Sequence, residues 1–355
     1  MIRNDDLGYP IVIGNSLRSE LRHFLHDRDT DVVVLADRNV APLAERLTKG
    51  TRGGVIVHRF DLGERRKTLA TLERILDVLI ESGVERTTTI VGVGGGVACD
   101  LFGLAASLCM RGLDYIGVAT TLVAMADAAI GGKTGVNLAR GKNLAGTFAQ
   151  PRAVFCELDA LRTLPYARLR EGLAEVVKAA IIEGGRFFSL LEEVAALPFR
   201  AWPWAEIVEE SVKVKTMYVA DDRTEQGARE TLNLGHTFAH AIERASHYRV
   251  SHGAAVAVGL RAAGLAALKT GRFSRIEHGR VLTLLALLGL PLRTGVDPSE
   301  ILASLSVDKK RRNGRLRFVL PLAIGDVEPG VEVPTRVVRS VIEACVTPPS
   351  AREFV

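Results

Sequence analysis

Three histidines and one glutamate in the second half of the chain could hold a metal ion. His236 and His240 lie four positions apart, and His252 follows sixteen positions after His236, among small and apolar residues. Glu175 lies upstream in a helical run, three positions before Lys178. Two histidines and a glutamate, with one position left open, are typical of catalytic zinc. Buried histidines held by hydrogen bonds remain an alternative, as does an ordinary salt bridge between Glu175 and Lys178.

A second candidate feature is a glycine-rich turn that could bind a phosphate group. Gly94, Gly95 and Gly96 end a strand-like run and open a helical one. Consecutive glycines let the backbone approach a pyrophosphate, and the free N–H groups at the start of a helix favour an anion. Val97 stands where the dinucleotide motif GxGxxG has its last glycine, so a plain strand-to-helix turn is the alternative.

Lys133, Lys142 and Asn143 lie on a glycine-rich stretch that could bind anionic oxygens. The run Gly131–Thr134 matches the end of a P-loop, but Asp127 occupies the position of that motif's first glycine, which disfavours a nucleotide triphosphatase. Lysine and asparagine donors suit phosphate or carboxylate oxygens. Lysines exposed to solvent are the alternative.

The charge of the chain suits a small anionic substrate. Lys and Arg number 46 against 41 Asp and Glu, which gives a net charge of +5. The densest basic segment spans residues 308–317 and could be an exposed hairpin. Nucleic-acid binding is disfavoured, because aromatic residues that could stack on bases make up only 5% of the chain.

Alternating strands and helices must position the residues of the first half. Apolar runs predict strands at 9–14, 31–36, 54–57, 88–93 and 115–118. Between the third and fourth, residues 69–80 place six apolar side chains on one helical stripe. Val- and Ile-rich strands separated by helices predict a parallel sheet with both faces covered.

The second half has helical periodicity instead. Amphipathic patterns predict helices at 168–183, 204–219, 237–245, 253–269 and 280–288, and a strand at 316–321. A length of 355 residues favours two domains, and Pro165 discourages helix just before it. We therefore predict a Rossmann-like α/β domain over residues 1–164 and a mostly α-helical domain over residues 165–355.

The cysteines and apolar runs indicate the compartment. Cys99, Cys109, Cys156 and Cys345 are widely spaced, which favours buried, reduced thiols. Neither a membrane-spanning run nor the apolar region of a signal peptide is present in the sequence, so we expect a cytoplasmic protein that does not enter a membrane.

Together these segments resemble the 3-dehydroquinate synthases of the sugar phosphate cyclase family. Each matching block is short, and their shared order along the chain carries the resemblance. The blocks cover residues 61–69, 94–100, 111–112, 119–122, 127–143, 172–178, 221–229, 233–243, 252–253 and 308–310. The chain departs from the family pattern at Ala119, where proline is common, and at Ala254, where glutamate is common.

The resemblance implies two cofactors. Zinc, or cobalt in its place, would be held by Glu175, His236 and His252, with His240 left for substrate. NAD would bind in the first domain, and the residues implied for it are Asp37, Glu64, Lys67, Gly94, Gly95, Gly96, Val97, Asp100, Thr120, Thr121, Asp127, Lys133, Lys142 and Thr163.

The resemblance also implies an anionic sugar phosphate as substrate. Its implied pocket residues are Asp127, Lys133, Lys142, Asn143, Lys178, Lys215, Arg229, Asn233, His240 and Lys309. Arg111 would reach the phosphate bound by a neighbouring protomer, which implies a homodimer. Lys310 is the alternative to Lys309.

The implied reaction is a lyase step of the shikimate pathway, which leads to chorismate and the aromatic amino acids. The enzyme would convert 3-deoxy-D-arabino-heptulosonate 7-phosphate to 3-dehydroquinate and phosphate by transient oxidation with NAD, β-elimination, reduction and aldol closure. A sibling cyclase of secondary metabolism, such as an amino-dehydroquinate synthase, and a metal-dependent NAD polyol dehydrogenase are the alternatives. Asn233 and His240 beside Arg229 favour the dehydroquinate reaction.

Overall fold

The chain forms two compact units in the computed structural model, which describes residues 1–28, 30–51, 55–306, 311–312 and 315–346. The first unit contains Met1–Leu169 and Pro203–Thr224, and the second contains Arg170–Trp202 and Glu225–Val355. The chain therefore passes from the first unit to the second, returns for one helix, and passes back. The domain boundary predicted at residues 164–165 stays a prediction.

A seven-stranded sheet forms the centre of the first unit. Its strands lie in the order β1-β2-β9-β6-β5-β3-β4, and all neighbours are parallel except β1 and β2. The strands span Ile2–Asn4 (β1), Ile11–Gly14 (β2), Val32–Asp37 (β3), Val57–Phe60 (β4), Thr89–Gly94 (β5), Asp114–Ala119 (β6) and Ala153–Glu157 (β9). The predicted parallel sheet is confirmed.

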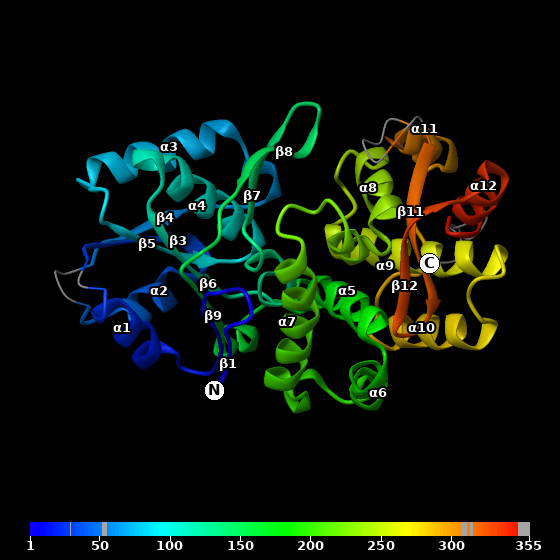
Figure 1. Ribbon diagram of the computed structural model, residues 1–355, viewed down its shortest axis with the longest axis horizontal. Helices are drawn as coiled ribbons and strands as arrows, with labels where there is room; N and C mark the ends of the chain where they lie inside the picture. Colours follow the sequence, from blue (N-terminus) through cyan, green and yellow to red (C-terminus); the bar gives the residue numbers. More distant parts are fainter. Residues whose placement is uncertain (29, 52–54, 307–310, 313–314, 347–355) are drawn as a thin grey trace. The chain divides into compact units, whose positions relative to one another are not determined.

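Helices cover both faces of this sheet, as Figure 1 shows. On one face, α3 (Leu69–Glu81) and α4 (Gly96–Leu108) pack in an apolar cluster with the side chains of β3 and β5. On the other face, α1 (Arg18–His26) and α2 (Ala41–Thr48) pack in a second cluster. Since both faces are covered, the inner strands β3, β5 and β9 are buried and mostly apolar, which is why strands such as β3 and β5 can be recognised in the sequence.

The strand predicted at residues 54–57 is wrong in its position. β4 begins at Val57, where pairing with Val34 of β3 starts. Ile56 is 71% exposed, so its apolar side chain lies before the edge strand β4 and outside the buried sheet. Apolar content alone could not distinguish these two environments.

Lys133 and Lys142 lie on the two strands of a β-hairpin rather than on turns. β7 (Lys133–Leu138) pairs antiparallel with β8 (Gly141–Phe148) after a π-helical turn at Ala124–Ala128. A Cβ on Gly146 would lie 1.9 Å from the carbonyl oxygen of Thr134, so this glycine lets the strands approach. The first unit is completed by 3-10 turns at Arg38–Val40, Glu64–Arg66, Cys109–Arg111 and Leu158–Arg162, and by α7 (Trp204–Asp221).

The second unit is mainly helical, as predicted. Its helices are α5 (Tyr166–Glu183, whose first residues belong to the first unit), α6 (Gly185–Val194), α8 (His236–Ala245), α9 (His252–Lys269), α10 (Arg275–Leu287), α11 (Pro298–Ser306) and α12 (Thr335–Ala344). Turns at Phe199–Ala201 and Ala228–Asn233, and the strands β10 (Arg311–Arg312), β11 (Arg315–Ala323) and β12 (Asp326–Glu332), complete it. Within the described part of the chain, we find no helix with the length and apolar character needed to cross a membrane.

Two glycines bring the helices of this unit close together where the candidate metal ligands lie. A Cβ on Gly259 of α9 would lie 2.3 Å from the carbonyl oxygen of Gly235, immediately before α8. A Cβ on Gly253 would lie 2.3 Å from the carbonyl oxygen of Glu171 in α5. Backbone therefore packs on backbone at both positions, which holds the start of α9 against α5 and α8.

Candidate functional site

Glu175, His236 and His252 converge in the second unit from three different helices. Nε2 of His252 lies 2.9 Å from Oε1 of Glu175, and Nε2 of His236 lies 3.4 Å from the same oxygen. One potential ligand atom from each of the three residues lies within 4.8 Å of the others. The sequence placed these residues on separate segments, and the folding of α5, α8 and α9 brings them together.

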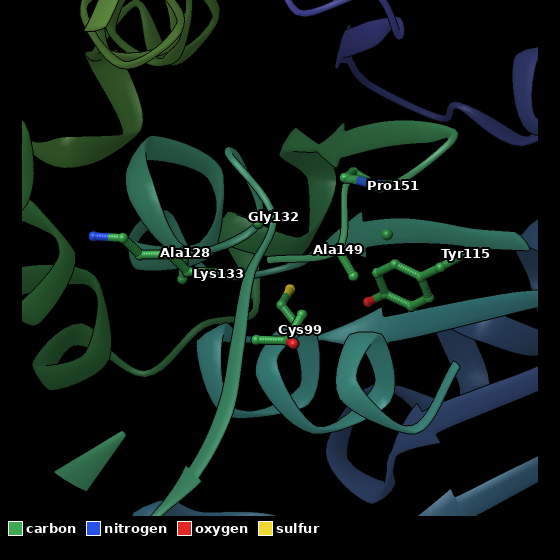
Figure 2. Close-up of a pocket in the computed structure, with 10 residues that line it drawn as sticks. Cys99, Tyr115, Ala128, Gly132, Lys133, Ala149 and Pro151 are labelled. Atoms are coloured by element: carbon green, nitrogen blue, oxygen red, sulfur yellow. The ribbon is translucent and has the colours of Figure 1, made fainter. Parts of the chain in front are cut away.

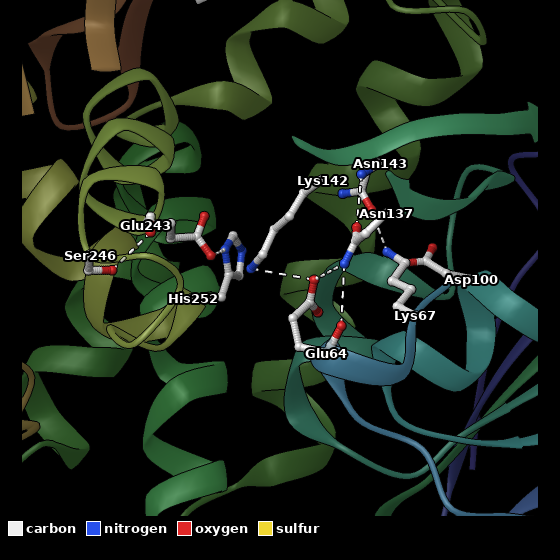
Figure 3. A network of polar contacts seen from close by, with 9 residues as sticks. All are labelled: Glu64, Lys67, Asp100, Asn137, Lys142, Asn143, Glu243, Ser246 and His252. Atoms are coloured by element: carbon white, nitrogen blue, oxygen red, sulfur yellow. Dashed lines mark hydrogen bonds and ion pairs between the residues drawn. The ribbon is translucent and has the colours of Figure 1, made fainter. Parts of the chain in front are cut away.

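Each of these three side chains also has a contact on its outer side. Nζ of Lys178 lies 2.6 Å from Oε2 of Glu175, and Nδ1 of His236 donates to the carbonyl oxygen of Leu234 at 3.2 Å. Nδ1 of His252 lies 3.5 Å from Oε1 of Glu243, as Figure 3 shows. These contacts turn both Nε2 atoms toward Glu175.

The electrostatics of this cluster favour a charged carboxylate at its centre. Burial opposes ionisation of Glu175, but Lys178, His236 and His252 overcome that effect and hold its pKa well below the ordinary value. For His252, burial is likewise outweighed by Glu175 and Glu243, which raise its pKa to about 10. Two imidazole nitrogens and a buried carboxylate are a donor set that fits zinc. The cluster is therefore a possible metal site.

Among the other predicted residues of the second unit, His240 lies beside these ligands, and Arg229 and Asn233 lie just before His236 in the chain. His240 is half-buried one helical turn after His236, with ring centroids 5.5 Å apart. Arg229 is fully buried in the turn Ala228–Asn233. Asn233 is the last residue of this turn and lies outside the helix, because α8 begins only at His236.

The glycine turn of the first unit is built as a close-approach site. β5 ends at Gly94, and α4 begins at Gly96. A Cβ on Gly94 would lie 2.4 Å from the Cβ of Ala98, and a Cβ on Gly95 would lie 2.9 Å from Cγ2 of Thr121. The N–H of Thr120 donates to the carbonyl oxygen of Gly94 at 3.0 Å. Because its glycines carry no side chains, the turn presents bare backbone N–H groups at the start of α4. Such a turn fits the pyrophosphate of a dinucleotide.

Charged groups implied in cofactor binding lie on neighbouring segments of this unit. Lys67 is buried and contacts both Asp100 and Asn143. Burial raises the pKa of Asp100 to about 6, although Lys67 opposes this shift. Burial also raises the pKa of Asp37, whose carboxylate accepts the N–H of Asn39 at the end of β3. Among the other implied residues, Val97 lies in the first turn of α4 and Thr163 follows the turn Leu158–Arg162.

The lysines implied in anion binding are paired with carboxylates. Nζ of Lys215, on α7, lies 2.5 Å from Oδ1 of Asp127, and Nζ of Lys142 lies 3.4 Å from Oε1 of Glu64. Lys133 is half-buried at the start of β7. The ion pair of Lys142 and the partial burial of Lys133 argue against the alternative of lysines exposed to solvent.

Two further predictions concern Arg111 and Lys309. Arg111 is exposed, with a left-handed backbone conformation at φ 68°. Lys309 and its alternative Lys310 lie outside the described residues.

A small cavity in the first unit is not the cofactor site. It has a volume of about 10 Å³ and is lined by Cys99, Tyr115, Lys133 and Thr134, among others (Figure 2). A cavity of this volume has room for about one water molecule. All four cysteines are buried and free, as predicted.

Sequence reasoning missed two residues of these networks. In the sequence, Glu243 ends the matching block 233–243 and Asn137 lies within the block 127–143, and neither residue was assigned a role. In the structure, Glu243 lies beside His252, and Asn137 is bonded to both Glu64 and Asn143. Their residue types offered a weak signal, because the contacts that involve them connect distant segments.

Comparisons with known proteins agree with this arrangement. The family model described as 3-dehydroquinate synthase N-terminal matches residues 57–171, and the model described as 3-dehydroquinate synthase C-terminal matches residues 172–311. The 3-dehydroquinate synthase of Halorhodospira halophila is 42% identical over 345 residues, covering 95% of this chain and 96% of the relative.

Solved structures of sugar phosphate cyclases have the same fold. The 2-epi-5-epi-valiolone synthase of Streptomyces hygroscopicus subsp. jinggangensis, solved with NAD⁺ and Zn²⁺, is 29% identical, with a TM-score of 0.88 over 95% of this chain and 96% of the other. A 2-deoxy-scyllo-inosose synthase solved with carbaglucose-6-phosphate, NAD⁺ and Co²⁺ is 26% identical, with a TM-score of 0.86 over 95% of this chain and 97% of the other. With the family matches over residues 57–311, this chain belongs to the 3-dehydroquinate synthase family.

Proposed function

We propose that this protein is a carbon–oxygen lyase that converts 3-deoxy-D-arabino-heptulosonate 7-phosphate to 3-dehydroquinate and phosphate. The observation that carries the proposal is the cluster of buried Glu175, buried His236 and half-buried His252 in a chain that matches 3-dehydroquinate synthases over residues 57–311. The curated relative from Halorhodospira is also more similar in sequence, at 42%, than the two sibling cyclases, at 29% and 26%.

Two cofactors belong to this proposal. Zinc, held by Glu175, His236 and His252, would supply a Lewis acid for substrate hydroxyl groups. NAD, bound at the turn Gly94–Gly96, would supply transient oxidation and be regenerated in each turnover. Asp37, Glu64, Lys67, Asp100, Thr120, Thr121 and Thr163 are the further residues that we assign to NAD.

The substrate carries a phosphate and a carboxylate, and the chain offers cations for both. In the first unit, Lys133, Lys142 and Lys215 would donate to anionic oxygens, with Asn143 next to Lys142 in the chain. Asp127 neutralises Lys215 before substrate binds, since their charged atoms lie 2.5 Å apart. In the second unit, Lys178 and Arg229 are buried cations that a doubly charged anion would stabilise.

The residues of the second unit also orient the reacting part of the substrate. His240 follows His236 on α8, and its half-buried imidazole would hydrogen bond a substrate oxygen. Asn233 donates to Oε1 of Glu225 at 2.7 Å, which orients its amide. These groups would hold the substrate while its C–O bond to phosphate breaks and the substrate's own phosphate oxygen accepts the proton.

The biological setting follows from the proposed reaction. The product would enter chorismate and aromatic amino acid biosynthesis through the shikimate pathway, in the cytoplasm. We also propose a homodimer, in which Arg111 of one protomer reaches the substrate phosphate of its partner.

A substrate comparison tests the proposal against its alternatives. We expect phosphate release from 3-deoxy-D-arabino-heptulosonate 7-phosphate and none from a heptulose 7-phosphate that lacks the carboxylate. The reverse preference would indicate a sibling cyclase. Accumulation of NADH in proportion to substrate consumed would indicate a polyol dehydrogenase, because a cyclase reoxidises its cofactor in each turnover.

A further inference from the structure

Asn137, near the end of β7, uses both ends of its side-chain amide and its backbone N–H in contacts within the first unit. Its Oδ1 accepts the backbone N–H of Asn143 at 3.0 Å, and its Nδ2 donates to Oε1 of Glu64 at 2.8 Å and to the Glu64 carbonyl oxygen at 3.3 Å (Figure 3). Its own backbone N–H donates to the carbonyl oxygen of Lys67 at 2.8 Å. Asn137 therefore contacts both the segment Glu64–Lys67 and Asn143, which lies about 80 positions after Glu64 in the sequence.

The contact with Asn143 fixes an unusual backbone. Asn143 has a φ of 52°, in the left-handed region that non-glycine residues rarely adopt. Its Oδ1 accepts from Nζ of Lys67 at 2.5 Å, and Lys67 also contacts Asp100. Accepting the backbone N–H of Asn143 lets Asn137 stabilise this conformation and direct the Asn143 side chain toward Lys67.

The same contacts fix the turn that precedes Lys67. Glu64 is bonded to Asn137 through both its side chain and its carbonyl group, and it pairs with Lys142 at 3.4 Å. The network of Asn137, Glu64 and Lys67 thus contacts Lys142 through Glu64 and Asn143 through Lys67. Loss of the Asn137 side chain would release both segments together.

We infer that Asn137 is a positioning residue that holds the cofactor-binding segment Glu64–Lys67 and the substrate-binding pair Lys142–Asn143 in one arrangement. This inference rests on the proposed function for the roles of those four groups, but it concerns a residue with no assigned role. Asn137 touches neither ligand in this account. It acts through hydrogen bonds to the groups that do.

The test measures NAD binding and catalysis separately in the full-length protein loaded with zinc. Asn137→Ala should weaken NAD binding, measured by calorimetry without substrate, by about ten-fold and raise the KM for the sugar phosphate by a similar factor, while kcat changes less. Thr147→Val is the matched control, because it removes a hydroxyl contact with Thr134 in the same hairpin but outside the network. The control should leave both affinities unchanged.

A second set of variants, at Asn137 and Glu64, distinguishes the positioning role from a merely structural effect. Asn137→Asp places a carboxylate against Glu64 and should weaken NAD binding. In a Glu64→Gln background, whose own NAD affinity is measured first, the new carboxylate meets an amide donor, so Asn137→Asp should cause a smaller further loss. Wild-type NAD affinity in Asn137→Ala, or an equal loss from Asn137→Asp in the wild-type and Glu64→Gln backgrounds, overturns the positioning role. Failure of the wild-type protein to bind NAD or release phosphate would instead overturn the proposed function.

Discussion

Glu175 is the residue on which the proposed metal centre depends most. Its Oε1 lies near both histidines, and its Oε2 pairs with Lys178, so one carboxylate joins all three neighbours. A buried ligand with this many charged partners cannot be replaced by a neighbouring side chain. Removal of the carboxylate should therefore affect metal binding before it affects the fold.

We predict that Glu175→Ala lowers zinc content from about one ion per chain to nearly none and lowers activity by more than about 100-fold. The metal should be measured by atomic emission on the purified protein, and the fold by circular dichroism. Glu183→Ala is the control, because Glu183 is exposed at the end of the same helix. Full zinc content with full activity in Glu175→Ala would rule out this ligand set.

The pKa of Asp100 predicts a pH dependence for NAD binding. Burial raises this pKa to about 6, above the ordinary 3.8, with Lys67, Glu64 and Asp127 as its charged neighbours. Above pH 6 the carboxylate can accept a ribose hydroxyl, and this capacity is lost as the pH falls through 6. NAD should therefore bind about ten-fold more weakly at pH 5 than at pH 8.

Unfolding would not explain this loss, because a carboxyl with a raised folded-state pKa binds its proton more tightly in the folded state and stabilises the fold as the pH falls from 6 toward 3.8. Calorimetry from pH 5 to pH 8 checks the profile. Asp100→Asn should make it flat, and an unchanged slope in that variant would assign the titration to another group.

Residue types and spacing could predict many single residues but not their partners. Glu175, His236 and His252 are recognisable because histidine is rare in this chain, with eight in 355 residues. Glu243 and Asn137 carry no such signal. Their contacts depend on how α8 meets α9 and how β7 meets the turn at Glu64.

At the scale of elements, the turn between β5 and α4 leaves no room for added volume. Gly94 has no room for a side chain, because its Cβ would lie 2.4 Å from the Cβ of Ala98. The turn and the helix that follows it must therefore shift together if this glycine is replaced. Such a shift would move the backbone N–H groups that we assign to the pyrophosphate.

We predict that Gly94→Ala destabilises the protein by about 1–3 kcal/mol and weakens NAD binding strongly. Thermal unfolding and calorimetry measure the two effects. Gly279→Ala is the comparison, since nothing lies within 4 Å of a Cβ at that position in α10. Tight NAD binding by Gly94→Ala would show that the cofactor does not use this turn.

Elements with strong periodicity were predictable, and those defined by pairing were not. Residues 69–80 were expected to be helical, and α3 spans Leu69–Glu81. The glycine-rich stretch after Asp127 gave no strand signal, although it forms β7 and β8, because its strands are stabilised by close backbone approach at Gly146 rather than by apolar alternation. Helix α8 was expected at 237–245 and begins one residue earlier.

At the scale of the whole molecule, the return of the chain through α7 could not be read from the sequence. The amphipathic pattern at 204–219 was assigned to the helical region, whereas α7 belongs to the first unit and places Lys215 beside Asp127. Periodicity shows that a helix has an apolar face but not which sheet or helix covers that face.

The proposed homodimer makes a prediction about mixtures of inactive variants. If Arg111 acts on the partner's substrate, Arg111→Ala and Lys178→Ala should each be inactive alone. Subunits mixed and reassociated in equal amounts should regain about a quarter of wild-type activity, because half of the dimers are hybrids with one complete site each. No recovery in hybrids confirmed by mass spectrometry would place Arg111 in its own protomer's site or outside any site.

The most direct test of the account is the reaction itself. Purified protein with zinc and a catalytic amount of NAD should release phosphate from 3-deoxy-D-arabino-heptulosonate 7-phosphate, with 3-dehydroquinate appearing at the same rate in NMR spectra. NADH should not accumulate. Folded protein that binds zinc and NAD but forms no 3-dehydroquinate from this substrate would contradict the account.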